Sequence, residues 1–296
     1  MLSPKPWKLD AIVRLAASVF LCVYAGGLLV PVLQASTTGK HNAQLYGISG
    51  LAFACLTVSM VLLWRPWRLE KAVRQMVALL ICFYAGVLLG AFALRSASPV
   101  VPSVRQMVIA ALSFQGTALV FVHLFVRQHQ MTWRESFGFA NQWPQAIMLG
   151  IIVACFFLPL GWGLQWVSSK LIVMVPRLHL KPEEQQAVQT LQMASASFQR
   201  VALGFVTIGL APLAEEILFR GILYPWLKQA GFPRLALWVS ALFFAAVHMN
   251  LVTFVPLLVL ALALTLLYER TGNLLAPITA HALFNGMNFF VLYSFL

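Results

Sequence analysis

The chain has 296 residues, of which 61% are hydrophobic and only 9% are charged. A soluble domain carries about 25% charged residues, so this composition excludes a soluble globular protein and indicates a membrane protein. The net charge of +12 is spread over short loops between apolar stretches. Because basic loops orient membrane proteins, the charge indicates a lipid bilayer as partner and no nucleic acid.

The apolar stretches are about 20 residues long and lack the strict alternation of barrel strands, which predicts transmembrane helices. We therefore expect an all-α fold, a polytopic membrane helical bundle of about eight or nine transmembrane helices. In chain order the predicted spans are 11–33, 43–64, 73–94, 104–126, 144–167, 201–227, 234–249, 252–268 and 274–295.

The first and third of these stretches are similar in sequence. Residues 14–29 align with residues 74–89, and Arg, Cys, Tyr-Ala-Gly and Leu-Leu coincide. One interpretation is a duplicated helical hairpin, as in transporters built from parallel repeats. The other is that two helix-packing faces rich in small residues look alike.

The polarity pattern divides the chain into three parts: N-terminal transmembrane helices over 1–170, a polar connector over 171–200, and a compact apolar core over 201–296. Apolar residues of the connector recur at helical spacing, namely Val188, Leu191, Ala194 and Phe198. This spacing predicts an amphipathic helix at the membrane interface, which would serve as a connector or as a gate for substrate entry.

The loops carry an uneven charge. With the N-terminus inside, the inner loops hold twelve Lys and Arg residues and the outer loops seven. By the positive-inside rule we expect an integral protein of the cell (plasma) membrane with its N-terminus in the cytoplasm.

Two acids lie side by side within the apolar stretch 201–227. Glu215 and Glu216 are followed four residues later by Arg220. An ionisable group at membrane depth costs roughly 2.5–3.5 kcal/mol on insertion scales, so such groups indicate function. Glu216 and Arg220 share a helix face and can pair. Glu215, about 100° around the helix, is left to face another partner.

Two later stretches contribute further polar groups. Phe244 lies one turn before His248 on the same helix face. His281 and Asn285 also share a face, and Asn288 follows one turn later. A single His at a helix end is usually an interfacial residue, so the functional prediction rests on the combination of these groups.

A carboxylate, two imidazoles and an amide can hydrolyse a peptide bond in two ways. In one, Glu215, His248 and His281 bind a divalent metal, such as zinc, that activates water. In the other, Glu215 and His248 polarise a water directly, while His281 and Asn285 stabilise the oxyanion. The residues leave both mechanisms open.

The three motifs, EExxxR at 215–220, FxxxH at 244–248 and HxxxN at 281–285, resemble those of the CPBP family. That family contains the type II CAAX prenyl endopeptidases and the Abi proteins, which process bacteriocins or confer self-immunity. The resemblance covers about 201–290 and implies an intramembrane endopeptidase, a CAAX-protease-like hydrolase. Its substrate would be a membrane-associated peptide or protein, either prenylated or carrying a leader.

The resemblance also implies residue roles. Glu215 would activate water with His248 as its partner, and His281 and Asn285 would form the oxyanion site. The first two motifs would supply supporting residues, which are Glu216, Arg220 and Phe244. Members of the family are commonly described as metalloproteases, yet an archaeal CAAX protease is interpreted as a metal-free glutamate enzyme, so the cofactor question stays open.

Two other functions are compatible with the sequence. One is a non-catalytic immunity or scaffold protein that retains the same fold, and the other is a transporter, which the repeat and the intramembrane acids would suit. Gly-x-Ser-x-Gly, HExxH and P-loop motifs are absent, and Asp10 is the only Asp, which disfavours a Ser/His/Asp hydrolase. A protein without catalysis has no physical need for both imidazoles in apolar helices, so we favour the peptidase.

Overall fold

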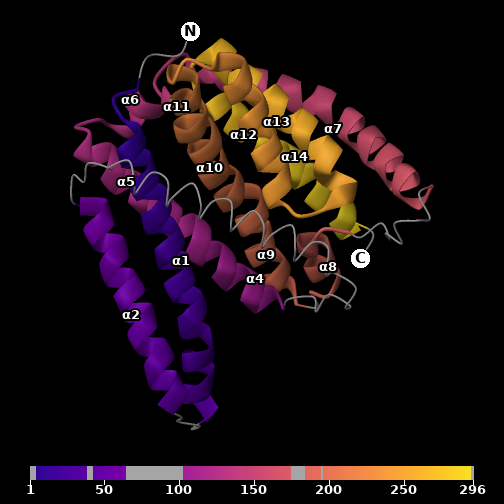
Figure 1. The fold of residues 1–296 in the computed structure, drawn as a ribbon. Helices are drawn as coiled ribbons and strands as arrows, with labels where there is room; N and C mark the ends of the chain where they lie inside the picture. The colour runs from indigo at the N-terminus through magenta and orange to yellow at the C-terminus, as the bar shows by residue number, and fades with distance from the viewer. Residues whose placement is uncertain (1–4, 39–42, 65–102, 175–183, 195, 295–296) are drawn as a thin grey trace.

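A computed structural model describes residues 5–38, 43–64, 103–174, 184–194 and 196–294, and these residues form helices and no strands (Figure 1). The α-helices are α1 (Leu9–Thr38), α2 (Ala43–Trp64), α4 (Val104–Ala111), α5 (Thr117–Gln128), α6 (Trp133–Phe137), α7 (Trp143–Val173), α8 (Gln186–Gln192), α9 (Ser197–Gly204), α10 (Ala211–Glu216), α11 (Tyr224–Gln229), α12 (Pro233–Val247), α13 (Leu251–Thr271) and α14 (Leu275–Ser294). Three π-helical segments, η1 (Leu112–Gly116), η3 (Phe205–Leu210) and η4 (Ile217–Leu223), join neighbouring α-helices.

Six helical segments of the described residues are long and apolar enough to cross a membrane: Leu9–Gly26, Met107–Gln128, Trp143–Val173, Ser197–Gln229, Leu251–Thr271 and Leu275–Ser294. Two shorter apolar helices cover Ile48–Leu63 and Pro233–Val247. The polytopic helical membrane fold is therefore confirmed. The predicted span 73–94, and with it the second copy of the repeat, lies outside the described residues, so eight or nine spans remains a prediction.

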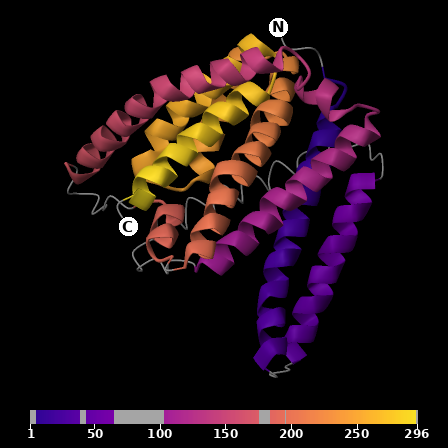
Figure 2. The same ribbon diagram turned by 180° about the vertical axis from the view of Figure 1, so that it is seen from behind.

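The α1–α2 hairpin projects away from the C-terminal helices, whereas α7 lies alongside α13 and α14 on the opposite side (Figures 1 and 2). Two hydroxyls join the hairpin: Ser18 Oγ donates to the Ser59 carbonyl at 3.0 Å, and Ser59 Oγ donates to the Ser18 carbonyl at 2.8 Å. Lipid tails are as apolar as the helices, so such hydrogen bonds help hold transmembrane helices together.

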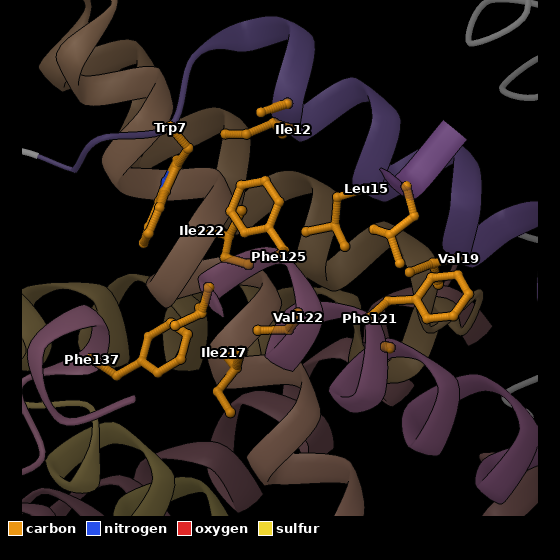
Figure 3. Close-up of a cluster of buried hydrophobic side chains, with 14 of the residues drawn as sticks. Trp7, Ile12, Leu15, Val19, Phe121, Val122, Phe125, Phe137, Ile217 and Ile222 are labelled. Atoms are coloured by element: carbon orange, nitrogen blue, oxygen red, sulfur yellow. The ribbon is translucent and has the colours of Figure 1, made fainter. Parts of the chain in front are cut away.

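The helical segment Ser197–Gln229 separates two apolar cores. Its residues Ile217 and Ile222 pack with Phe125 and other side chains of α1 and α5 (Figure 3). Phe219 belongs to the second core with residues of α7, α12, α13 and α14, among them Phe244. The segment with the acid pair is thus fixed on two sides, which gives the charged side chains defined positions.

This segment alternates between α and π register. Each π segment precedes a proline: η3 ends just before α10, which contains Pro212, and η4 ends just before α11, which contains Pro225. A proline lacks the N–H for the helical ladder and clashes with the carbonyl four residues back. Local widening of a membrane helix accommodates this defect. At Pro212 the helix continues through a change of register.

The predicted amphipathic helix through Val188 and Phe198 is wrong. Helix α8 ends at Gln192, and Ala196 is extended before α9 begins at Ser197. This interruption lets Leu191 and Ala194 pack in a third core with Val104 of α4. Phe198 instead lies exposed on α9. The helix with the acid pair therefore begins at Ser197, before the predicted residue 201, while the three-part division of the chain remains a prediction.

Helices α7 and α14 approach closely at a glycine. A Cβ on Gly150 would lie 2.5 Å from the Ala276 carbonyl oxygen and 2.9 Å from Thr279 Cβ. On the same helix, a Cβ on Gly163 would meet nothing within 4 Å. Small residues permit such close helix approach in membranes.

We predict that Gly150→Val destabilises the protein by about 1–3 kcal/mol, because the added side chain pushes against the α14 backbone. The matched control is Gly163→Val, which adds the same volume to the same helix in open space. Thermal unfolding in detergent measures both, and equal losses would contradict the proposed packing role of Gly150.

Candidate active site

Glu215 and two histidines from different helices converge. His248 Nε2 lies 4.0 Å and His281 Nε2 lies 3.9 Å from the same oxygen, Glu215 Oε2. Glu215 belongs to α10, His248 follows the last residue of α12, and His281 belongs to α14. The Glu215 and His248 side chains are 19% and 25% exposed, so the site is reachable, whereas His281 is 2% exposed.

Hydrogen bonds to the other ring nitrogen orient both imidazoles. His248 Nδ1 lies 2.7 Å from the Phe244 carbonyl oxygen, and His281 Nδ1 lies 2.8 Å from Glu216 Oε1. A carbonyl, and a carboxylate paired with a guanidinium, can only accept, so both Nδ1 atoms donate. In the neutral rings, each Nε2 then presents a lone pair toward Glu215.

A fully buried ion pair holds Glu216 in place. Arg220 Nη1 donates to Glu216 Oε1 at 2.8 Å, and the two side chains are 1% and 0% exposed. Helix α13 supplies acceptors for the rest of the guanidinium: the Ala261 carbonyl at 3.1 Å from Nη2 and Thr265 Oγ1 at 3.4 Å from Nε. Arg220 Cζ also lies 4.5 Å from the Phe244 ring centroid. The predicted Glu216–Arg220 pairing is confirmed.

Phe244 lies at the centre of this arrangement. Its ring centroid is 4.9 Å from that of His248 and 5.7 Å from that of His281. Phe219 packs against it edge-on at 5.2 Å. The aromatic ring therefore packs against Arg220 and against both imidazoles.

The two asparagines of α14 have different partners. Asn285 Nδ2 donates to the Thr207 carbonyl of η3 at 2.9 Å. Asn288 Oδ1 accepts from Trp162 Nε1 of α7 at 2.8 Å, so Asn288 is engaged with another helix and does not extend the His281 pair. The structure thus brings together the three converging groups and ties Asn285 to the helix that contains Glu215.

Sequence reasoning missed Thr265 and the carbonyls of Ala261 and Thr207. Thr265 is the one hydroxyl in the apolar stretch 254–267 of α13, and that scarcity could have identified it. The two backbone carbonyls could not be identified in this way, because every residue has one. For Thr207, the only sequence signal is the proline five residues later.

Two imidazole lone pairs and a carboxylate are the donor set of a three-ligand catalytic metal site, and the Nδ1 contact of His281 with Glu216 is the usual outer support. Ligands of a tetrahedral zinc lie about 3.4 Å apart. The separations of 3.9 and 4.0 Å are wider, and no three His, Cys, Asp or Glu in the described ranges are grouped as a ready metal site. The donor chemistry is of the kind that binds a divalent metal, and a metal bound there would require the three groups to move closer together.

The fold and these residues define a polytopic membrane protein in which a carboxylate and two imidazoles converge. Residues 197–287, which include all three motifs, match the family described as "Type II CAAX prenyl endopeptidase Rce1-like". This segment is therefore similar to the Rce1-like domain, and at the level of the family the similarity supports a CAAX-protease-like intramembrane peptidase.

One curated relative matches a segment of similar length. The uncharacterised protein YpbD of Bacillus subtilis (strain 168) is 36% identical over 87 residues, which are 28% of this chain and 41% of YpbD. The chain thus matches less than half of that relative. No solved structure matches the chain significantly.

We predict that Glu216→Gln and Glu215→Gln differ sharply in stability. Glu216→Gln leaves the Arg220 charge buried without its counter-ion, which costs about 3–5 kcal/mol. Glu215 is partly exposed and outside that pair, so Glu215→Gln should cost less than about 1 kcal/mol. Thermal unfolding of the purified variants compares them, and similar losses would argue against the division of roles between the two acids.

Proposed function

We propose that the protein is an intramembrane endopeptidase in which Glu215 activates the attacking water. The observation that carries this proposal is the convergence of His248 Nε2 and His281 Nε2 on Glu215 Oε2 at 4.0 and 3.9 Å. Helices α10, α12 and α14 would be stabler with apolar residues at these positions, since intramembrane polar groups are costly. The arrangement is most simply explained by chemistry at this point.

The proposed reaction is peptide hydrolysis. The water oxygen forms a bond to the peptide carbonyl carbon, and its proton passes to Glu215. When the C–N bond breaks, Glu215 returns that proton to the leaving amine. His248 orients the water through its Nε2 lone pair. Asn285 donates an amide hydrogen to the oxyanion. His281, protonated at Nε2 from solvent before the attack, donates a second hydrogen bond to it and keeps that proton through the cycle.

The same residues could instead hold a metal. Glu215, His248 and His281 would be its ligands, and Glu216 would keep the His281 ring oriented through Nδ1. A divalent metal such as zinc would supply a more acidic bound water and Lewis-acid polarisation of the carbonyl. Both chemistries use this chain's groups in the same positions.

The location of the site supports a membrane-associated substrate, because Glu215 lies within a segment long enough to span the bilayer. That this peptide or protein is prenylated or carries a leader is suggested by the similarity to the Rce1-like family alone. The bias of Lys and Arg toward the loops on the N-terminal side supports a cell-membrane protein with a cytoplasmic N-terminus.

We predict that Glu215→Gln abolishes peptide release, with at least a 100-fold loss, because a general base contributes about 10²–10⁴-fold. Peptide-release proteomics on membranes holding wild type or variant measures this loss. The matched control is Glu269→Gln, which alters a carboxylate of α13 bound to Lys228 and Tyr224 and should keep activity.

A strong chelator separates the two mechanisms in the same assay. Loss of wild-type release on chelation, restored by added zinc, supports the metal mechanism, and unchanged release supports the metal-free one. Identical peptide profiles for wild type and Glu215→Gln would contradict the peptidase proposal and favour a non-catalytic scaffold.

A further inference from the structure

The π register of η3 leaves one carbonyl without a backbone donor. The Ala211 N–H donates to the Val206 carbonyl, five residues back. If the same five-residue spacing continued for one more residue, the amide N–H of residue 212 would donate to the Thr207 carbonyl. Residue 212 is proline, which has no N–H. The Thr207 carbonyl is therefore left to find another donor.

Asn285 supplies that donor. Its Nδ2 lies 2.9 Å from the Thr207 carbonyl oxygen. Leaving a carbonyl unpaired in apolar surroundings costs about as much as a lost hydrogen bond, so this contact is favoured. It joins η3 to α14 one turn beyond His281, on the helix face that the sequence assigns to both residues.

We propose that Pro212 is a positioning residue for the Asn285 amide, an inference that rests on the proposed peptidase function. An amide NH₂ has two hydrogens. With one hydrogen committed to the Thr207 carbonyl, the planar amide cannot rotate, and its second hydrogen keeps one direction for a substrate oxyanion. Pro212 thus acts through its missing N–H, because the Thr207 carbonyl stays available to Asn285.

The kinetic test is Pro212→Ala, which restores an N–H that competes for the Thr207 carbonyl. We expect kcat to fall about tenfold with KM nearly unchanged, since losing an oxyanion donor outright costs about 10²–10³-fold. Adding Asn285→Ala to this variant should lower kcat less than it does in wild type. The matched control, Pro225→Ala, changes the other proline that follows a π segment and should leave kcat near wild type.

A second measurement does not depend on activity. In thermal unfolding, Asn285→Ala should lower Tm by about 2–4 °C more in the wild type than in the Pro212→Ala background, where the backbone already pairs the carbonyl. Pro212→Ser restores the same N–H and replaces the alanine variant if that variant does not accumulate in membranes.

The outcomes distinguish the two proposals. One outcome is that the wild type is active and Asn285→Ala lowers Tm equally in both backgrounds, or that the kcat losses of the two substitutions are additive. This outcome overturns the positioning role of Pro212 and leaves the peptidase proposal standing. A second outcome is that the Tm losses depend on the background while the wild type releases no peptide. This outcome supports the Thr207–Asn285 contact, but it overturns the peptidase function and the catalytic part of this inference.

Discussion

The buried pair of Arg220 and Glu216 is the interaction on which the candidate site depends. Two charges that are 1% and 0% exposed lie at membrane depth, where desolvation can exceed their mutual attraction. The surroundings offset this cost, because α13 provides two oxygen acceptors and Phe244 an aromatic face for the guanidinium. The pair also performs a task that an apolar substitute could not: Glu216 Oε1 accepts from His281 Nδ1 and so turns Nε2 toward Glu215.

The cost of unpaired polar groups in lipid also explains the backbone of the site helix, although Glu216 Oε2 is itself buried without a hydrogen-bond partner. Two prolines interrupt the backbone ladder, and the chain responds with π segments rather than with a break. Register changes of this kind are frequent at functional sites. Here η3 leaves the Thr207 carbonyl to accept from Asn285, and this hydrogen bond joins the helix of Glu215 to the helix of His281.

Helical spacing predicted the contacts between side chains on one helix. The spacing of Glu216 and Arg220 predicted their pairing, although Arg220 lies in the π segment η4, and the angle between adjacent residues predicted that Glu215 faces elsewhere. The spacing did not predict the π segments themselves, the Thr207 carbonyl contact or the interruption between α8 and α9. Those features depend on which neighbouring helix offers a donor or a cavity, and a single sequence does not contain that information.

The adjacency of the two acids solves a geometric problem. One acid must be fixed and shielded, and the other must stay accessible to water and substrate. Neighbours on a helix point about 100° apart, so a single turn can bury Glu216 against α13 and α14 while leaving Glu215 19% exposed beside His248. In both proposed mechanisms, with a metal or with water alone, His281 Nε2 lies at the reaction centre. The Arg220–Glu216 pair would consequently serve both, because Glu216 orients the His281 ring through Nδ1.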